Sequence, residues 1–226
     1  MPDAKIAAAI VDYGLGNLFS VKHACSHAGI EGTITSDRDD LLKSDVVILP
    51  GVGAYRDAMA SLHKLDLVSV MQDISAAGKP LVGICLGMQL LMTRSYEFGN
   101  YLGLGIIDGP VVRFKEPKLA TENGEKTLKV PQICWNQIYR PEGKDNWDGT
   151  YLKGLDEGTY MYFVHSYYAQ PDDPAVWLTE TTYGDITFCS GLRRDNVFAC
   201  QFHPERSGPL GLKVYGNIAE LVAGRS

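Results

Sequence analysis

The stretch Lys79–Gln89, KPLVGICLGMQ, carries the strongest indication of both fold and chemistry in this 226-residue chain. It begins as an apolar run typical of a buried strand and stops at Cys85, between Gly83 and Gly87. G-x-C-x-G is the form of a nucleophile elbow, the tight strand-to-helix turn that lifts a reactive side chain clear of its sheet. Glycines fit there because a Cβ atom would crowd the turn. We therefore predict that Cys85 is a nucleophile at the start of a helix. The alternative is a buried core cysteine beside a tight turn.

The sequence on either side of this stretch alternates between apolar strands and helices. Strands are expected at residues 6–13, 44–51 and 80–85, and helices at 17–29, 55–78 and 87–99. Strands that are apolar on both faces and separated by helices indicate a parallel sheet covered on both sides.

The second half of the chain has a different pattern. Strand-like runs joined by turns occupy residues 128–140, 159–170, 175–184, 186–194 and 197–205, with no long helix before residues 211–222. The polar segments 115–127 and 140–150 are expected to be exposed loops within the same domain. We predict one domain over residues 1–226, of the α/β class. It has a mixed, mostly parallel central sheet with helices on both faces and antiparallel strands added in the C-terminal half.

Charge and cysteine content exclude several classes of protein. A formal net charge of −6 and a pI near 5.3 argue against a surface for nucleic acid or an anionic membrane. No apolar run reaches the roughly 18 residues that span a bilayer, and the N-terminal apolar segment leads into Asp12, with no signal-peptide cleavage site. The five cysteines are widely spaced and form no C-x-x-C. Free thiols in a reducing cytosol are the natural interpretation, so we expect a cytoplasmic protein.

A general base for the thiol is available late in the chain, in FACQFHPER. His203 and Glu205 are two residues apart, and in a β-like segment such residues point the same way. Glu205 can then hold the His203 ring in the tautomer that leaves its other nitrogen facing Cys85. The alternative for a His-x-Glu pair is an ordinary surface pairing. We predict a Cys85–His203–Glu205 triad, with the backbone N–H of Leu86 as a donor to an oxyanion.

The motifs G-I-C-L-G-M-Q and Q-F-H-P-E closely resemble those of the class I, triad-type glutamine amidotransferases, and the resemblance covers essentially the whole chain. It implies that Cys85 attacks the side-chain amide of glutamine, forming a γ-glutamyl thioester and releasing ammonia. His203 would protonate the leaving amine and then activate the hydrolytic water. The resemblance further implies that Gln89 and Ser166 bind the substrate, and that the reaction uses no cofactor and no metal ion.

Four more segments, D-Y-G-L-G-N-L, L-P-G-V-G-A, I-C-W-N and H-P-E-R-S-G, resemble one branch of that family. The branch comprises the amidotransferase subunits of imidazole glycerol phosphate synthase, in histidine biosynthesis. This resemblance implies that Gly51 and Val52 supply an oxyanion-hole amide. It also implies a heterodimer with a cyclase subunit, a (β/α)₈ barrel that uses the ammonia to make imidazole glycerol phosphate and AICAR, with Trp135 and Asn136 near the contact. Cys134 stands where the branch commonly has glycine, a departure that concerns the interface and not the chemistry.

Other functions compete with this one. Gly14-x-Gly16 after a strand, with Asp37 further on, is compatible with a dinucleotide-binding oxidoreductase, although Phe19 is too large for the third glycine position. An amidotransferase subunit of another pathway, a cysteine peptidase or a free-standing γ-glutamyl hydrolase would use the same triad, and a non-catalytic binding module would not need it. Structural roles are expected for the remaining histidines: His23, His27, His63 and His165.

Overall fold

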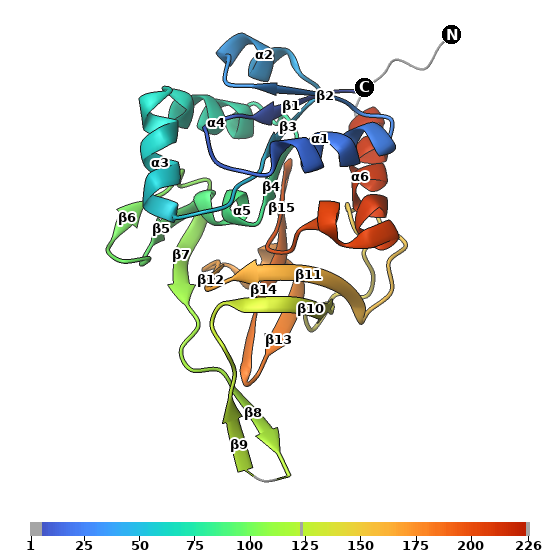
Figure 1. The fold of residues 1–226 in the computed structure, drawn as a ribbon. Coiled ribbons are helices and arrows are strands. Elements are labelled where there is room, and N and C mark those ends of the chain that lie inside the picture. The colour runs from blue at the N-terminus through green and yellow to red at the C-terminus, as the bar shows by residue number, and fades with distance from the viewer. Residues whose placement is uncertain (1–5, 123, 225–226) are drawn as a thin grey trace.

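A seven-stranded sheet with the strand order β13-β14-β15-β4-β3-β1-β2 forms the centre of the computed structural model, which describes residues 6–122 and 124–224 (Figure 1). Five neighbouring strands are parallel: β1 (Ala7–Val11), β2 (Glu31–Thr35), β3 (Val46–Leu49), β4 (Leu81–Ile84) and β15 (Val197–Cys200). Two antiparallel strands, β14 (Ile186–Arg194) and β13 (Trp177–Tyr183), extend the sheet beyond β15. The predicted mixed, mostly parallel sheet is confirmed.

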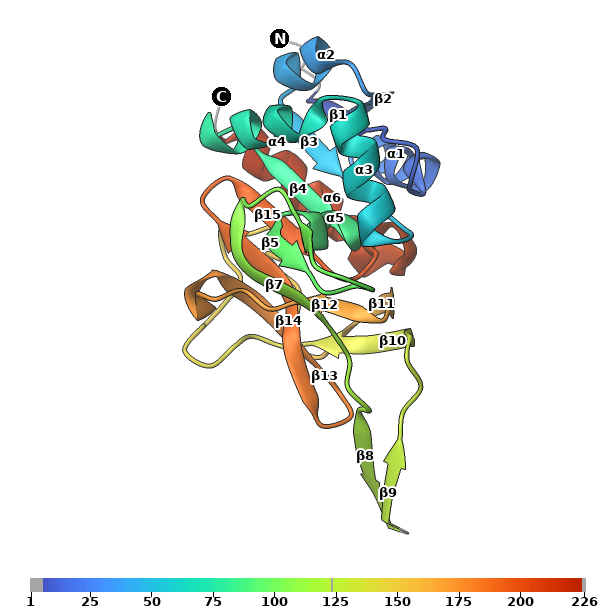
Figure 2. The ribbon, with the colours of Figure 1, turned by 90° about the vertical axis from the view of Figure 1, so that its left-hand side faces the viewer.

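Helices cover both faces of this sheet, as predicted (Figure 2). One face, to which Ile10 and Val82 contribute, packs against α1 (Leu18–His27) and α6 (Gly208–Ala223). The opposite face, to which Val47 contributes, packs against α2 (Arg38–Lys43), α3 (Tyr55–Lys64) and α4 (Leu67–Ala76). Two apolar cores result because successive side chains of a strand point to opposite faces.

Two of the predicted helices differ from those observed. The helix expected at residues 55–78 is broken between α3 and α4, where Asp66 takes a left-handed φ of 53°. The helix expected at 87–99 ends after one turn, as α5 (Leu86–Leu90), and the chain continues as the strand β5 (Met92–Ser95). A segment as short as residues 92–95 cannot be assigned to a helix or to a strand from its sequence alone. Pairing with β7 (Ile107–Arg113), a contact distant in sequence, decides for the strand.

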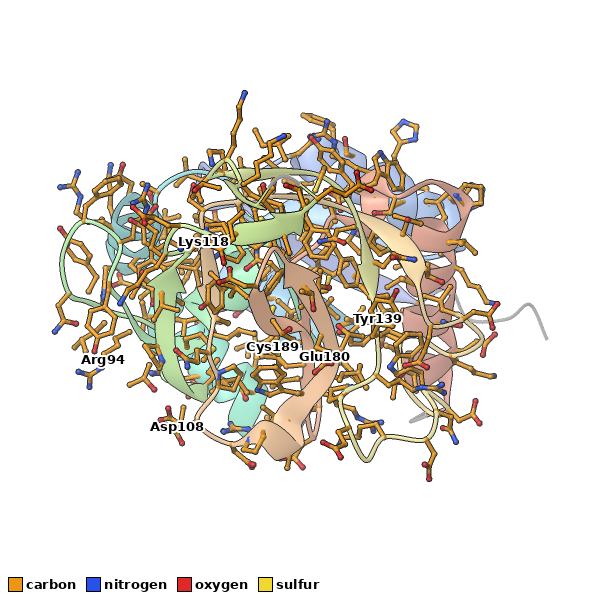
Figure 3. The ribbon with its side chains drawn as sticks, turned by 90° about the horizontal axis from the view of Figure 1, so that it is seen from below. Arg94, Asp108, Lys118, Tyr139, Glu180 and Cys189 are labelled. Carbon is orange, nitrogen blue, oxygen red and sulfur yellow. The ribbon has the colours of Figure 1, made fainter. Side chains whose placement is uncertain are left out.

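Smaller sheets, formed by strands between residues 92 and 169, lie beside the carboxyl ends of the parallel strands (Figure 1). One contains β12 (Tyr167–Ala169), β7, β5 and β6 (Tyr101–Leu102). The other is a two-stranded ribbon of β10 (Gln132–Ile138) and β11 (Thr159–His165). Tyr139, at the end of this ribbon, exchanges two backbone hydrogen bonds of 2.9 Å with Glu180 of β13, and the two residues lie side by side in Figure 3. The ribbon is thereby attached to the main sheet.

The segments expected to be exposed loops have more structure than the sequence indicated. Residues 115–127 contain a hairpin of β8 (Lys118–Thr121) and β9 (Gly124–Thr127), which projects from the body of the molecule (Figures 1 and 2). In segment 140–150, Trp147 is buried and its indole N–H donates to the carbonyl of Leu178 at 2.9 Å. A prediction from the spacing of apolar residues misses both the hairpin and the buried Trp147, because both segments are mainly polar. Within residues 6–122 and 124–224, no helix is long and apolar enough to cross a membrane.

Candidate active site

Three neighbouring parallel strands place the predicted triad and oxyanion residues at one edge of the sheet. β4 ends immediately before Cys85, and β15 ends two residues before Phe202 and three before His203. The backbone N–H of Cys85 donates to the carbonyl of Cys200 at 2.8 Å, which continues the β4–β15 pairing to the corner. β3, on the other side of β4, ends just before the segment 50–53. The carboxyl ends of parallel strands are where open α/β sheets bind ligands.

The corner at Cys85 has the predicted strand-to-helix geometry. Cys85 has φ 55° and ψ −110°, a conformation that residues other than glycine populate sparsely. Gly87 must lack a side chain because a Cβ atom there would lie 1.8 Å from the carbonyl oxygen of Leu49. The helix that follows is only five residues long. A helix this short places little dipole charge at the Cys85 sulphur.

The imidazole of His203 and the carboxylate of Glu205 form a buried pair. His203 Nδ1 lies 2.8 Å from Glu205 Oε1, and the two side chains are 4% and 2% exposed. Pro204–Arg206 form a 3₁₀ turn, so a tight turn brings the pair together and not the strand alternation that we expected. Burial by itself lowers the pKa of His203, but Cys85 and Glu205 outweigh that effect and raise the pKa to about 10. Among the described residues, His203 Nε2 has no hydrogen-bond partner. Because Nδ1 contacts Glu205, Nε2 is the ring nitrogen that is available to Cys85.

Strand β11 fixes the backbone of the turn that carries this pair. The N–H of His203 donates to the carbonyl of Tyr162 at 2.9 Å. Ser207 Oγ donates to the carbonyl of His203 at 2.6 Å and accepts from the N–H of Tyr162 at 3.0 Å. Both backbone groups of one β11 residue therefore hold the turn, which leaves the imidazole little freedom to shift.

A cavity of about 390 Å³ opens at the Cys85 corner, a volume suited to a small ligand. Five of the residues predicted from the sequence line it: Val52, Cys85, Leu86, Gln89 and Ser166. Gly51 is absent from the lining of this cavity, whereas Gly53 lines it. Gly51 instead permits close packing, since a Cβ there would lie 2.2 Å from Tyr13 Oη and 2.9 Å from Leu86 Cβ.

The cavity also has polar lining residues that the sequence analysis did not single out. Glu97 follows β5 and accepts a 2.5 Å hydrogen bond from the N–H of Tyr55. The guanidinium of Arg206 lies 4.6 Å from the centre of the Tyr162 ring. Glu97 lies in a segment that was expected to be helical, and a single glutamate in a helix gives no indication of a binding role. Arg206 directly follows the H-P-E motif, which could have drawn attention to it.

His165 also lines the cavity, although most of its ring is surrounded by aromatic side chains. Its Nδ1 lies 2.8 Å from the carbonyl of Tyr167, which can only accept, so Nδ1 carries the proton. Burial lowers its pKa to about 4, and the ring is therefore neutral near pH 7. This environment accords with the structural role expected for His165.

The two residues expected near a partner lie on opposite faces of β10. Trp135 is 50% exposed and points outward, together with Ile133 at 60% and Tyr160 at 54%. Asn136 points the other way, and its side-chain N–H₂ donates to the carbonyl of Thr182 at 2.9 Å. Neighbours on a strand cannot share one face. A contact through the outer face would therefore use Trp135 and not the Asn136 side chain.

Comparison with known proteins identifies the family. The sequence model of the family described as "Glutamine amidotransferase class-I" matches residues 9–217. The chain belongs to the class I glutamine amidotransferases. This amidotransferase is 43% identical over 216 residues to "Imidazole glycerol phosphate synthase subunit HisH" of Geobacter sulfurreducens, covering 94% of this chain and 98% of that protein. It is 44% identical over 210 residues to the protein of the same description from Aquifex aeolicus, covering 92% and 94%.

Solved structures of low sequence identity share the fold of the amidotransferase. "Structure of PurLQS from Thermotoga maritima" superimposes with a TM-score of 0.70 at 20% identity, covering 96% of this chain and 99% of that one. "Crystal structure of glutamine amidotransferase" gives 0.68 at 18%, covering 96% and 98%. The resemblance stated from the motifs is confirmed at the level of the family, which leaves the oxidoreductase alternative without support. Among the described residues of the amidotransferase, no group of three or more His, Cys, Asp or Glu side chains could hold a metal ion.

Proposed function

We propose that this chain hydrolyses glutamine to glutamate and ammonia, as the amidotransferase subunit of imidazole glycerol phosphate synthase in histidine biosynthesis. The observation that carries the proposal is the buried His203–Glu205 pair, whose imidazole interacts with Cys85. Cys85 itself lies on a strained corner and lines a cavity of about 390 Å³. The HisH relatives supply the pathway, because their descriptions name the synthase.

The reaction follows from the roles of the three side chains. The Cys85 thiolate attacks the carboxamide carbon of glutamine, and an oxyanion forms on the carboxamide oxygen. His203, whose pKa is raised to about 10, holds a proton at neutral pH and gives it to the departing nitrogen, so ammonia leaves and a γ-glutamyl thioester remains. The now neutral imidazole takes a proton from water, which attacks the thioester. Glutamate leaves, and the thiolate and imidazolium are restored. Glu205 keeps Nδ1 protonated throughout.

Backbone amides of Leu86 and of the segment 51–52 stabilise the oxyanion. Tyr13 Oη donates to the carbonyl of Pro50 at 2.6 Å, which fixes the start of this segment. Gly53 has φ 107°, a conformation that glycine adopts without strain, so a change of backbone conformation at the end of the segment costs little. A peptide flip confined to residues 51–53 would turn an amide toward or away from the oxyanion. We propose that a loaded partner selects the active orientation.

The amino-acid end of glutamine lies against the polar part of the cavity. The Glu97 carboxylate and the side chain of Gln89 face the α-ammonium group, while Ser166 contacts the same end of the substrate. Opposite charge and hydrogen bonding then favour an α-amino acid over a simple amide.

The partner is the cyclase subunit, a (β/α)₈ barrel in a heterodimer with this chain. Ammonia in neutral water is mostly protonated and is then no nucleophile, so a protected path between the two sites prevents loss of glutamine. The outward face of the β10–β11 ribbon is suited to this contact because Ile133, Trp135 and Tyr160 are exposed apolar residues. The same ribbon reaches the cavity through Val164. An apolar patch that continues into a cavity is typical of a contact surface.

The test compares the purified chain, the chain with its cyclase subunit, and a Cys85→Ala variant of each. We expect very low glutaminase activity alone, strong stimulation by the cyclase and its ligand, and none in either Cys85→Ala sample. The variant complex should still carry out synthesis from added ammonium salts at alkaline pH. Glutaminase activity in Cys85→Ala would exclude the thioester mechanism. Full activity without stimulation would indicate a free-standing hydrolase.

A further inference from the structure

Gln201 is a buried polar residue that none of the proposed steps uses. It follows β15 directly, and its exposed fraction is 0%. Its side-chain N–H₂ lies 3.6 Å from Cys85 Sγ, within hydrogen-bond range for sulphur. Its Oε1 lies 2.9 Å from Nε2 of Gln89, which also lies 2.8 Å from the carbonyl of Tyr167. Two amide side chains therefore connect the candidate nucleophile to the strand β12.

One backbone carbonyl, that of Tyr167, determines which group donates in each hydrogen bond of the series from Tyr167 through Gln89 and Gln201 to Cys85. The carbonyl of Tyr167 can only accept, so Gln89 must turn its N–H₂ toward it. The second hydrogen of that N–H₂ then points to Gln201, which must present its oxygen. The N–H₂ of Gln201 is thereby turned to Cys85 Sγ as a donor. The Nδ1–H of His165 donates to the same carbonyl, which therefore accepts two hydrogen bonds.

We propose that Gln201 is a positioning residue of the glutaminase reaction: it donates a hydrogen bond to the Cys85 sulphur and fixes Gln89 so that Oε1 of Gln89 faces the substrate. The inference rests on the proposed function for the identity of the substrate, but its first half concerns the sulphur alone. A donor favours thiolate over thiol, because hydrogen bonds to charged acceptors are stronger than those to neutral ones. Gln89, with both N–H₂ hydrogens engaged, has only its oxygen left to accept from the α-ammonium group of glutamine.

The test is the pH profile of Cys85 alkylation in the free chain, measured with iodoacetamide and mass spectrometry of the Cys85 peptide. Gln201→Leu removes the donor with little change in volume and should move the midpoint of alkylation upward by about one pH unit. Gln201→Glu should move it further upward, since a carboxylate would then face the sulphur. In the complex with the cyclase subunit, Gln201→Leu should raise KM for glutamine as well as lower kcat, because Gln89 loses its support.

Gln132 offers a matched control. It is also 0% exposed, and its N–H₂ lies 3.7 Å from the sulphur of Cys134, a cysteine that lies outside the catalytic motifs. Gln132→Leu should leave the Cys85 alkylation profile where it is. A thermal melt identifies variants that are not folded, and Gln201→Glu takes the place of Gln201→Leu if the latter fails to fold.

Two results would overturn the inference: an unchanged alkylation profile in a folded Gln201 variant, or an equal displacement in Gln132→Leu. Alkylation requires neither glutamine nor the partner, so this failure is distinct from a failure of the proposed function. The latter would appear as glutaminase activity in Cys85→Ala.

Discussion

The backbone conformation of Cys85 leads to a prediction about stability that reverses the usual order of two substitutions. Cys85→Ala and Cys85→Gly both remove the sulphur, and under the proposed mechanism both should abolish glutaminase activity. They differ at the backbone, since alanine keeps the strain of φ 55° and ψ −110° whereas glycine relieves it. We expect the glycine variant to be the more stable of the two.

The magnitude is the difference between two opposing effects. A residue other than glycine in a sparsely populated conformation costs about 1–3 kcal/mol. Glycine in place of alanine costs roughly 0.5–1 kcal/mol, because the unfolded chain gains freedom. With both effects at the middle of their ranges, Cys85→Gly should exceed Cys85→Ala in free energy of unfolding by about 1.3 kcal/mol. For a domain of this size, that difference corresponds to a Tm higher by roughly 3–5 °C.

Urea unfolding at one pH, followed by circular dichroism, measures the difference, provided that both variants show the same slope against urea. The wild-type protein should be measured alongside the two variants, because it has both the strained backbone conformation and the sulphur at residue 85. If Cys85→Ala equals or exceeds Cys85→Gly in stability, the corner is not strained and the geometric argument for the nucleophile is wrong.

Three further predictions concern single side chains. His203→Ala should lower glutaminase activity by about 10²–10⁴-fold. Glu205→Gln should lower it less, because Glu205 acts only through its 2.8 Å contact with Nδ1 of His203. Equal losses in folded complexes would assign Glu205 a direct role. Gly87→Ala should cost at least about 1–3 kcal/mol, since its Cβ would lie 1.8 Å from a backbone oxygen, whereas Gly216→Ala in α6, with open space around it, should gain about 0.5–1 kcal/mol. Calorimetry would detect both, and a harmless Gly87→Ala would contradict the packing. As the pH falls from 6.5 to about 4, the unfolded chain protonates His165 while the folded chain does not, so wild type should lose up to about 1.4 kcal/mol per pH unit relative to His165→Gln. Parallel stability curves for the two proteins would show that the ring is already charged in the fold.

Much of the fold and of the site could be predicted from the sequence, because the relevant constraints are local. The elbow at Cys85 requires particular glycines on either side, and the apolar strands flanking it have few other interpretations. His203 and Glu205 came from two positions of one motif, and the structure brings them together even though the turn between them is not a strand. Family membership follows from the same motifs, with residues 9–217 matched.

Features that depend on contacts distant in sequence were not predictable. Residues 92–95 form a strand only because β7 pairs with them, so the sequence alone favoured a longer helix. Glu97 reaches the cavity as a consequence of that change. Strand alternation places Trp135 and Asn136 on opposite faces, but only the packing of β10 against β13 decides that Asn136 is the one that faces Thr182. Gln201 belongs to a predicted motif, but its role depends on the Tyr167 carbonyl, which sequence does not locate.

The β8–β9 hairpin has a consequence for how the length of this chain can vary. Every described residue of its two strands is exposed, so shortening it would uncover no apolar core. The N–H of Leu128 donates to the carbonyl of Pro117 at 2.7 Å, so the two ends of the hairpin already meet at its base. A short turn could replace residues 118–127 without moving the strands on either side. The same geometry makes the hairpin a site at which a reporter peptide or fluorophore can be inserted, well away from the Cys85 corner.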